Sequence, residues 1–163
     1  FSRLSRQPLQ RHMVEPEPLV YDAFREAIDA DQQRAVRLEI GPMPACYADP
    51  SLLRQVFANL LANAVKFTKS REEAVVQVSG AEMEGRATYR VRDNGVGFDS
   101  RFTHKLFGVF ERLHAFDEYE GTGVGLAIAH QIVTRHGGTI RADSVLNEYA
   151  EFIIELPAEP VQD

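Results

Sequence analysis

An amphipathic helix in the first half of the chain constrains the fold more than any other stretch. Apolar side chains recur at helical spacing from Leu52 to Val65, and a stripe this wide must pack on a hydrophobic core. Asp49 is placed to cap this helix. Pro50 suits its first turn, where a missing N–H costs nothing. The chain therefore contains a core helix that starts just after Asp49.

The same helix carries a second, polar face. Asn59, Asn63 and Lys66 follow one another at i, i+4 and i+7, so their side chains lie on one side of the helix. Carboxamide oxygens suit a hard divalent cation, and an ammonium group suits phosphate. A solvated polar face is the alternative reading of these three residues taken alone.

The composition excludes several classes of protein. The chain has 163 residues, 44% of them hydrophobic and 26% charged, which fits one globular domain. No apolar run is long enough to cross a membrane, and the first residues lack the pattern of a signal peptide. Cys46 is the single cysteine, which is compatible with a reduced, cytoplasmic setting. The net charge of -6 without a basic cluster argues against a nucleic-acid surface.

The remaining pattern predicts short elements around the core helix. Residues 1–18 are expected to be a linker or the remnant of a preceding helix, 19–157 one domain, and 158–163 a tail. A first helix is expected from Leu19 to about Ala30 and a last one from Val124 to His136. Gly80 to Gly85 should form the loop of a hairpin. Short helical pieces are expected at 102–113 and a loop at 115–121. The predicted strands are 36–40, 45–48, 74–79, 86–92, 139–143 and 151–155.

This order of elements is not a regular alternation of strands and helices. It favours an α+β two-layer sandwich with a mixed, mainly antiparallel sheet and helices on one face. The side chains expected to meet the sheet are Phe57, Leu60, Leu61, Leu126, Ile132 and Val133.

Two glycine clusters lie where a ligand could approach the backbone. Asp93 precedes Gly95 and Gly97 at a strand end, and a carboxylate there can accept a hydrogen bond from an exocyclic amine such as that of adenine. The glycines at 121–125 open a helix and offer N–H groups to a phosphate. A P-loop is excluded because no Lys-Ser/Thr follows these glycines. A dinucleotide-binding fold is disfavoured because residues 116–120 do not read as a strand.

Taken in order, these motifs resemble the catalytic and ATP-binding domain of sensor histidine kinases. The motifs are Asn59–Thr68, Asp93-x-Gly-x-Gly97, a Phe-rich segment and Gly121-x-Gly-x-Gly-Leu126. The wider family is the Bergerat ATP-binding fold, shared with gyrase, MutL-type repair proteins and a heat-shock chaperone. The likeness covers about residues 19–157. Residues 113–122 resemble kinases of the bacteriophytochrome group, which suggests light sensing through a chromophore domain elsewhere.

The resemblance implies a role for each matching residue. Asn63 would hold the Mg2+ that bridges the ATP phosphates, Asn59 would support it, and Lys66 would contact phosphate. Phe67 would pack beside the adenine, and Asp93 would accept the adenine amine. Residues 114–122 would form a lid over ATP, preceded by Phe107 and Phe110 of the Phe-rich segment. The other positions that the resemblance assigns to the nucleotide are Gly95, Gly97, Arg112, Gly121, Thr122, Gly123, Gly125 and Leu126.

The chain also departs from the family pattern. The family's ATP hydrolases carry a glutamate where this chain has Asn59, and an amide cannot act as a general base. This difference favours phosphoryl transfer over hydrolysis. None of the five histidines sits in a phosphoacceptor motif, so the acceptor hairpin is expected outside this chain. Glu151 stands where the family has a small hydroxyl residue, and a carboxylate near the nucleotide would weaken ATP binding.

Three functions follow as hypotheses. The chain is expected to be a kinase domain that binds Mg2+ and ATP and phosphorylates a histidine on the dimerisation hairpin of its own kinase, with a response regulator as the next partner. Because dimerisation in the family comes mainly from that hairpin, the fragment is expected to be a monomer. A degenerate, non-catalytic nucleotide-binding or docking module is the alternative, motivated by Glu151. An ATP hydrolase is the third hypothesis, which Asn59 disfavours.

Overall fold

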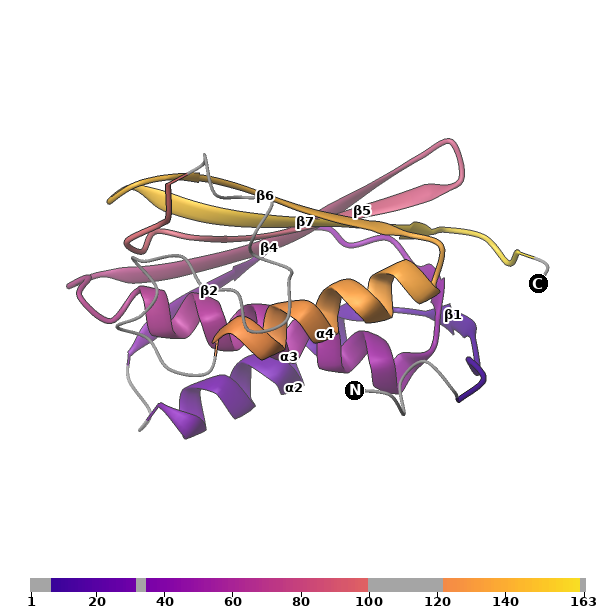
Figure 1. Cartoon of the computed structure of the whole chain (residues 1–163), viewed down its shortest axis with the longest axis horizontal. Helices are drawn as coiled ribbons and strands as arrows, with labels where there is room; N and C mark the ends of the chain where they lie inside the picture. The colour runs from indigo at the N-terminus through magenta and orange to yellow at the C-terminus, as the bar shows by residue number, and fades with distance from the viewer. Residues whose placement is uncertain (1–6, 32–34, 100–121, 162–163) are drawn as a thin grey trace.

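A sheet and a layer of helices form the part of the chain that the computed structural model describes, residues 7–31, 35–99 and 122–161 (Figure 1). The helices are α2 (Pro16–Ala30), α3 (Pro50–Phe67) and α4 (Thr122–Arg135). The strands are β1 (His12–Val14), β2 (Val36–Ile40), β3 (Cys46–Ala48), β4 (Ala74–Met83), β5 (Arg86–Asp93), β6 (Thr139–Val145) and β7 (Tyr149–Pro157).

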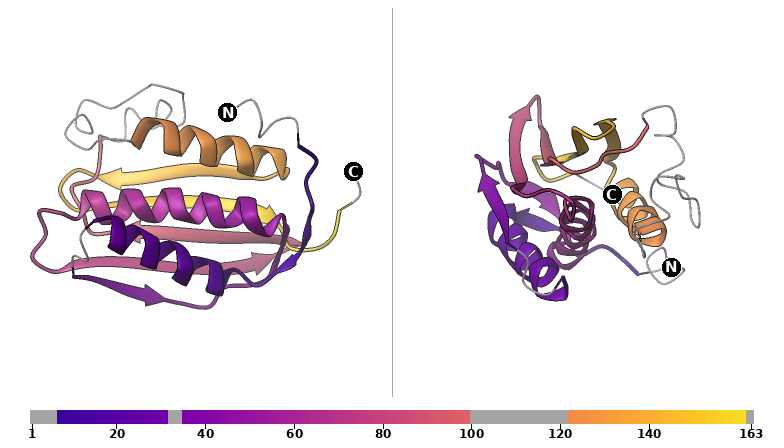
Figure 2. Two further views of the ribbon diagram at one scale, coloured as in Figure 1. Left: turned by 90° about the horizontal axis from the view of Figure 1, so that it is seen from below. Right: turned by 90° about the vertical axis from the view of Figure 1, so that its left-hand side faces the viewer.

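The larger sheet has five strands in the order β2-β4-β5-β7-β6. Its first pair, β2 and β4, runs parallel, and the other neighbouring strands pair antiparallel. Strands β1 and β3 form a separate two-stranded sheet. Figure 2 shows α2, α3 and α4 side by side on one face of the large sheet, with α3 in the middle. The predicted α+β sandwich with helices on one face is confirmed.

Helix α3 lies at the centre because its sequence gives it a firm start and a long apolar stripe. The Asp49 carboxylate accepts the N–H of Ser51 and of Leu52 at 3.2 and 3.4 Å. Burying each large apolar side chain contributes about 1.5–3 kcal/mol. The residues predicted to meet the sheet all lie in the core cluster: Phe57, Leu60, Leu61, Leu126, Ile132 and Val133.

The N-terminal part of the fold differs from the prediction. Helix α2 begins at Pro16 rather than at Leu19, because proline is tolerated in the first helical turn. Residues 12–14 form a strand against β3 and are not a linker. The division of the chain at residue 18 remains a prediction.

The hairpin between β4 and β5 is longer and tighter than predicted. Strand β4 runs to Met83, so the predicted loop from Gly80 to Gly85 is a two-residue turn at Glu84 and Gly85. Both turn residues have positive φ, 52° and 78°, as a tight hairpin turn requires. Gly80 lies inside strand β4, paired with Tyr89, and a Cβ there would lie 2.7 Å from the Tyr89 ring, so the position requires glycine.

The end of the chain is also more ordered than predicted. Strand β7 includes Pro157, and Ala158 is buried with its N–H donating to the Gly85 carbonyl at 2.8 Å. The predicted tail therefore begins later than expected. The helical pieces at 102–113 and the loop at 115–121 lie outside the described residues.

Helix α4 is attached to the start of α3 by His136. Its Nδ1 lies 2.8 Å from the Ile132 carbonyl, and its Nε2 accepts the Asp49 N–H at 3.0 Å. The ring is buried, and this burial lowers the pKa of His136. A neutral imidazole fits both contacts, because Nε2 can accept a hydrogen bond only while it carries no proton. Within the described residues, no helix has the length and apolarity needed to span a membrane.

Candidate nucleotide-binding site

Helix α3 carries Asn59 and Asn63 one turn apart. Asn63 is 4% exposed. The amide nitrogen of each side chain is buried and has no hydrogen-bond partner among the described residues. An unpaired buried amide costs about 1–3 kcal/mol, so two of them on one helix face need a reason. A bound ligand with hydrogen-bond acceptors would pair these two amide nitrogens.

The start of α4 lies against this face. A Cβ built on Gly125 would meet the Asn59 side chain at 3.7 Å, which is ordinary van der Waals contact. Thr122 and Gly123 begin the helix, and Leu126 is 1% exposed with its side chain in the core. Leu126 can therefore meet a ligand through its backbone alone in this conformation.

The Asp93 loop closes on the other end of α3. The Phe67 carbonyl accepts the Val96 N–H at 3.1 Å. A Cβ on Gly95 would overlap that carbonyl and would lie 2.8 Å from the Asp93 carboxylate. Glycine is therefore needed at this position because the loop and the end of α3 approach each other closely. The sequence predicts a different task for Gly95, which is close approach of the base. The Phe67 side chain is fully buried and offers no surface to a ligand in this conformation.

Gly97 has a second structural task. Its φ is +65°, and a Cβ there would lie 2.6 Å from the Val145 carbonyl and 2.7 Å from the Ser144 hydroxyl. The Ser144 hydroxyl in turn accepts the Phe98 N–H at 2.8 Å and donates to the Tyr149 carbonyl at 2.7 Å. Both glycines of the motif thus fix the loop against neighbouring backbone.

Asp93 is a buried carboxyl group, 3% exposed, on the helix-facing side of β5. Its Oδ1 accepts the Gly95 N–H at 2.8 Å. Burial raises the pKa of Asp93 to about 7, while the Gly95 N–H and the charges of Arg92 and Arg71 oppose part of the rise. A carboxyl group with such a pKa, held at a strand end, is typical of a binding site.

The predicted site residues therefore fall into two groups. Asn59 and Gly125 lie together, and Asp93, Gly95 and the Phe67 backbone lie together, with Asn63 between them on α3. Lys66 lies on the same helix and is half-buried. Arg112, Gly121, Phe107 and Phe110 lie outside the described residues.

Residues 48–160 match the family model for the histidine kinase-, DNA gyrase B- and HSP90-like ATPases. The chain belongs to this ATPase family. The match covers α3, the Asp93 loop, α4 and the β6–β7 hairpin, which are the elements that form the candidate site.

Relatives within the family include sensor kinases and phytochromes. The chain is 34% identical over 157 residues to cyanobacterial phytochrome A of Nostoc sp. (strain PCC 7120), covering 96% of this chain and 20% of that protein. It is 35% identical over 117 residues to the sensor protein kinase WalK of Staphylococcus aureus, covering 71% of this chain and 28% of that one. The chain spans about a fifth of the length of the phytochrome relatives.

Solved structures show the same fold. Full-length ShkA in complex with AMPPNP superposes with a TM-score of 0.79 at 27% identity, covering 96% of this chain and 33% of that one. The mycobacterial sensor histidine kinase MprB gives a TM-score of 0.78 at 24% identity, covering 92% of this chain and all of that one. Both structures share the fold of this chain over more than nine-tenths of its length.

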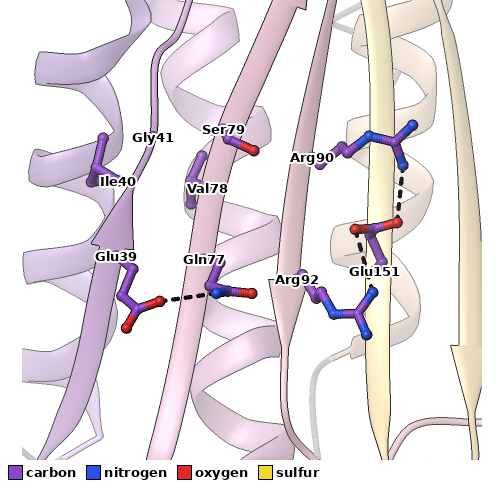
Figure 3. A pocket seen from close by; sticks show the side chains of 9 residues that line it. All are labelled: Glu39, Ile40, Gly41, Gln77, Val78, Ser79, Arg90, Arg92 and Glu151. Carbon is purple, nitrogen blue, oxygen red and sulfur yellow. Dashed lines mark hydrogen bonds and ion pairs between the residues drawn. The ribbon is translucent and has the colours of Figure 1, made fainter.

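Glu151 lies away from the candidate site of this ATPase fold, contrary to the expectation from sequence. In the register of β5 and β7, Asp93 pairs with Ala150 while Glu151 pairs with Arg92. Because neighbouring residues of a strand point to opposite faces, Glu151 lies on the face away from the helices. There it pairs with Arg90 at 3.0 Å and with Arg92 at 3.8 Å (Figure 3).

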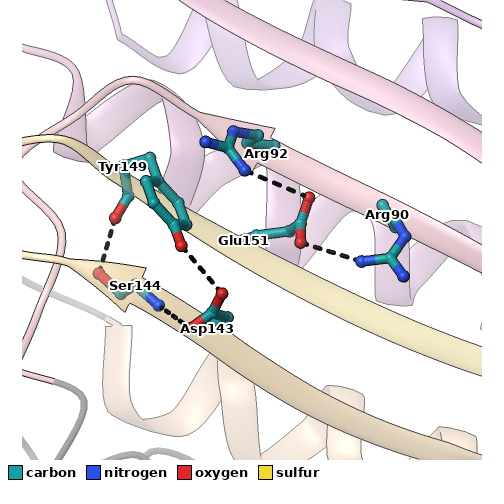
Figure 4. A network of polar contacts seen from close by, with 6 residues as sticks. All are labelled: Arg90, Arg92, Asp143, Ser144, Tyr149 and Glu151. Carbon is teal, nitrogen blue, oxygen red and sulfur yellow. Dashed lines mark hydrogen bonds and ion pairs between the residues drawn. The ribbon is translucent and has the colours of Figure 1, made fainter.

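The same outer face holds a polar network of matched charges (Figure 4). Arg92 stacks 3.8 Å from the centre of the Tyr149 ring, and the Tyr149 hydroxyl donates to Asp143 at 2.9 Å. The groove beside it, between β2 and β7, is lined by Glu39, Gln77 and Arg90, and Gln77 donates to Glu39 at 2.9 Å. These polar groups largely satisfy one another.

We expect Glu151→Gln to leave nucleotide affinity unchanged within about twofold, since the side chain lies on the far face of the sheet. Stability should fall by no more than about 1 kcal/mol, because the two ion pairs are partly exposed. Calorimetric titration with ATP and urea unfolding would measure both. A tenfold gain in ATP affinity would contradict the placement of Glu151.

Sequence reasoning missed two residues that shape the site. Asn94 accepts the Val75 N–H and donates to the Glu73 carbonyl, both at 2.8 Å. Arg71, which follows α3, donates from its Nε to the Asn94 carbonyl of the same loop at 2.7 Å. The turn-forming sequence Asp-Asn-Gly could have indicated a structural role for Asn94. Nothing in the sequence pattern distinguishes Arg71 from the neighbouring charged residues.

Proposed function

We propose that this chain is the ATP-binding catalytic domain of a sensor histidine kinase. It binds ATP and transfers the γ-phosphoryl group to a histidine on a helical hairpin outside the chain. The proposal rests above all on one observation: the loop of a buried carboxyl group, Asp93, closes on the helix that carries Asn59 and Asn63. Family membership and the sensor-kinase relatives support it.

The base site is formed by Asp93. Its carboxylate accepts the exocyclic amine of adenine, and the Gly95 N–H fixes the carboxylate from inside the protein. A buried charged acceptor strengthens this hydrogen bond, because little water competes for it. The amine in turn favours the ionised form of a group whose pKa is raised to about 7.

The phosphate end of the site belongs to Asn63, Asn59 and Lys66. No group of three His, Cys, Asp or Glu side chains among the described residues forms a metal site. One neutral carboxamide, Asn63, fits a Mg2+ that arrives with nucleotide phosphates and keeps several waters. When bound, Mg2+ would neutralise charge that develops on the phosphates during transfer. Lys66 would add a positive charge there.

Transfer is favoured over hydrolysis because Asn59 cannot remove a proton from water. Its amide is available to orient groups around Asn63, one turn further along α3. Thr122, Gly123 and Gly125 at the start of α4 would approach the phosphates through their N–H groups, with Arg112 and Gly121 as further contacts.

The proposed setting is cytoplasmic two-component signalling. The partners are a dimerisation hairpin with the acceptor histidine and, after it, a response regulator in a phosphorelay. The chain alone is proposed to be a monomer.

The decisive experiment mixes the chain with a separate histidine-bearing hairpin and ATP labelled at the γ-phosphate, with Mg2+ present. Base-stable, acid-labile label on the hairpin is the expected result. Steady release of free phosphate without the hairpin would indicate a hydrolase instead. ATP binding without either product would indicate a non-catalytic nucleotide-binding module. No ATP binding at all would refute the proposal.

A further inference from the structure

Arg71 lies in the turn between α3 and β4 and binds backbone from two other segments. Its Nε donates to the Asn94 carbonyl at 2.7 Å. Its Nη2 donates to the Gly95 carbonyl at 3.0 Å and to the Asn147 carbonyl at 2.5 Å. Its own N–H donates to the Thr68 carbonyl at 2.9 Å, just past the end of α3. The guanidinium thus joins the Asp93 loop to the β6–β7 turn, while the backbone N–H of the same residue holds it at the end of α3.

These contacts fix the peptide groups beside Asp93. The Gly95 N–H donates to the Asp93 carboxylate, while the carbonyl of Gly95 and that of Asn94 accept from Arg71. The planar fork of arginine suits such a set of carbonyls, and the compact ammonium of lysine cannot bridge all of them. Arg71 therefore holds the two carbonyls of the loop segment whose Gly95 N–H donates to the Asp93 carboxylate.

The charge of Arg71 also remains available to Asp93. No carboxylate among the described residues lies within ion-pair distance of Arg71. Its positive field opposes the effect of burial and lowers the pKa of Asp93. The same side chain thus holds the loop beside Asp93 and favours the ionised form of its carboxyl group.

We propose that Arg71 is a positioning residue for base recognition, which holds the Asp93 loop in the form that accepts the exocyclic amine of adenine. This inference rests on the proposed function. It predicts that Arg71 affects recognition of the base and leaves binding of the triphosphate unchanged, because the contacts of Arg71 lie at the Asp93 end of α3.

The test compares ATP with inosine triphosphate, which has a carbonyl oxygen in place of the amine. In Arg71→Met, we expect ATP affinity to fall roughly tenfold, about the loss of one hydrogen bond to a charged group. Affinity for inosine triphosphate should change less than twofold. Arg71→Lys keeps the charge but not the fork, so its loss of ATP affinity should be intermediate. Calorimetric titration of the 163-residue chain gives both affinities.

Arg25→Met is the matched control, because Arg25 is exposed on α2. Unchanged ATP affinity in Arg71→Met and Arg71→Lys would overturn the inference, and so would an equal loss for both nucleotides in Arg71→Lys. If Arg71→Met does not fold, the ratio of ATP affinity to inosine triphosphate affinity in Arg71→Lys decides the question alone. Failure of the wild-type chain to bind ATP would refute the proposed function itself, so the two failures are distinguishable.

Discussion

Asp93→Asn is expected to reverse the base preference of the site. ATP affinity should fall roughly 10- to 100-fold, because a hydrogen bond to a charged acceptor contributes about 1.5–3 kcal/mol. The asparagine amide can donate to the carbonyl oxygen of inosine triphosphate, so affinity for that nucleotide should hold or rise. Titration of the wild type and of Asp93→Asn with ATP and with inosine triphosphate at pH 8 measures the change. An unaltered ATP to inosine triphosphate ratio would refute the role of Asp93.

The same substitution should stabilise the nucleotide-free protein at high pH. Asp93 has an ordinary pKa of 3.8 when unfolded and about 7 when folded. The folded state therefore keeps a proton that the unfolded state has already lost, and stability falls as pH rises through this window. Above pH 7 the full penalty is present, of the order of 4 kcal/mol at about 1.4 kcal/mol per pKa unit.

Asparagine does not ionise and carries no such penalty. Urea unfolding without nucleotide should show a gain for Asp93→Asn that is large at pH 8 and smaller at pH 5. Comparison with the wild type at each pH removes the contribution of other titrating groups, including His136. A gain that does not vary with pH would show that Asp93 is already ionised at low pH in the folded state.

Asn63→Ala is expected to abolish the Mg2+-dependent part of ATP binding. In the presence of Mg2+, the ATP affinity of the variant should fall to the value that the wild type shows when a chelator removes Mg2+. Phosphoryl transfer should drop by about 100-fold or more, because metal stabilisation of the transferring group is worth several kcal/mol. Titration of Mg2+ alone should give no heat in either variant, since the site has one protein ligand. Equal Mg2+ dependence in both variants would rule out Asn63 as the ligand.

The stability of the Asn63 variant separates function from folding. The Asn63 amide nitrogen is buried without a partner among the described residues, so its removal should cost little or even stabilise. Asn94→Ala is the contrast, because that side chain makes two hydrogen bonds of 2.8 Å. It should lose about 1–3 kcal/mol. A large stability loss in Asn63→Ala would mean that its amide is paired.

The sequence by itself determined the layers of the fold and the helix at its centre. The apolar stripe of α3, its Asp49 cap and the alternation in the strands are local signals, so each can be read without knowing its partners. The Asn59–Asn63 spacing and the carboxylate at the end of β5 are local in the same sense. For that reason the candidate site residues could be named in advance.

Only the tertiary structure decided which face Glu151 occupies and what Gly95 and Arg71 do. The pairing of Asp93 with Ala150 turns Glu151 away from the site, and a shift of register by one residue would have reversed this. Gly95 and Arg71 act through contacts with Phe67, Asn94 and Asn147, which are distant in sequence. Such contacts depend on how strands and turns pack together, and periodicity along one segment carries no information about them.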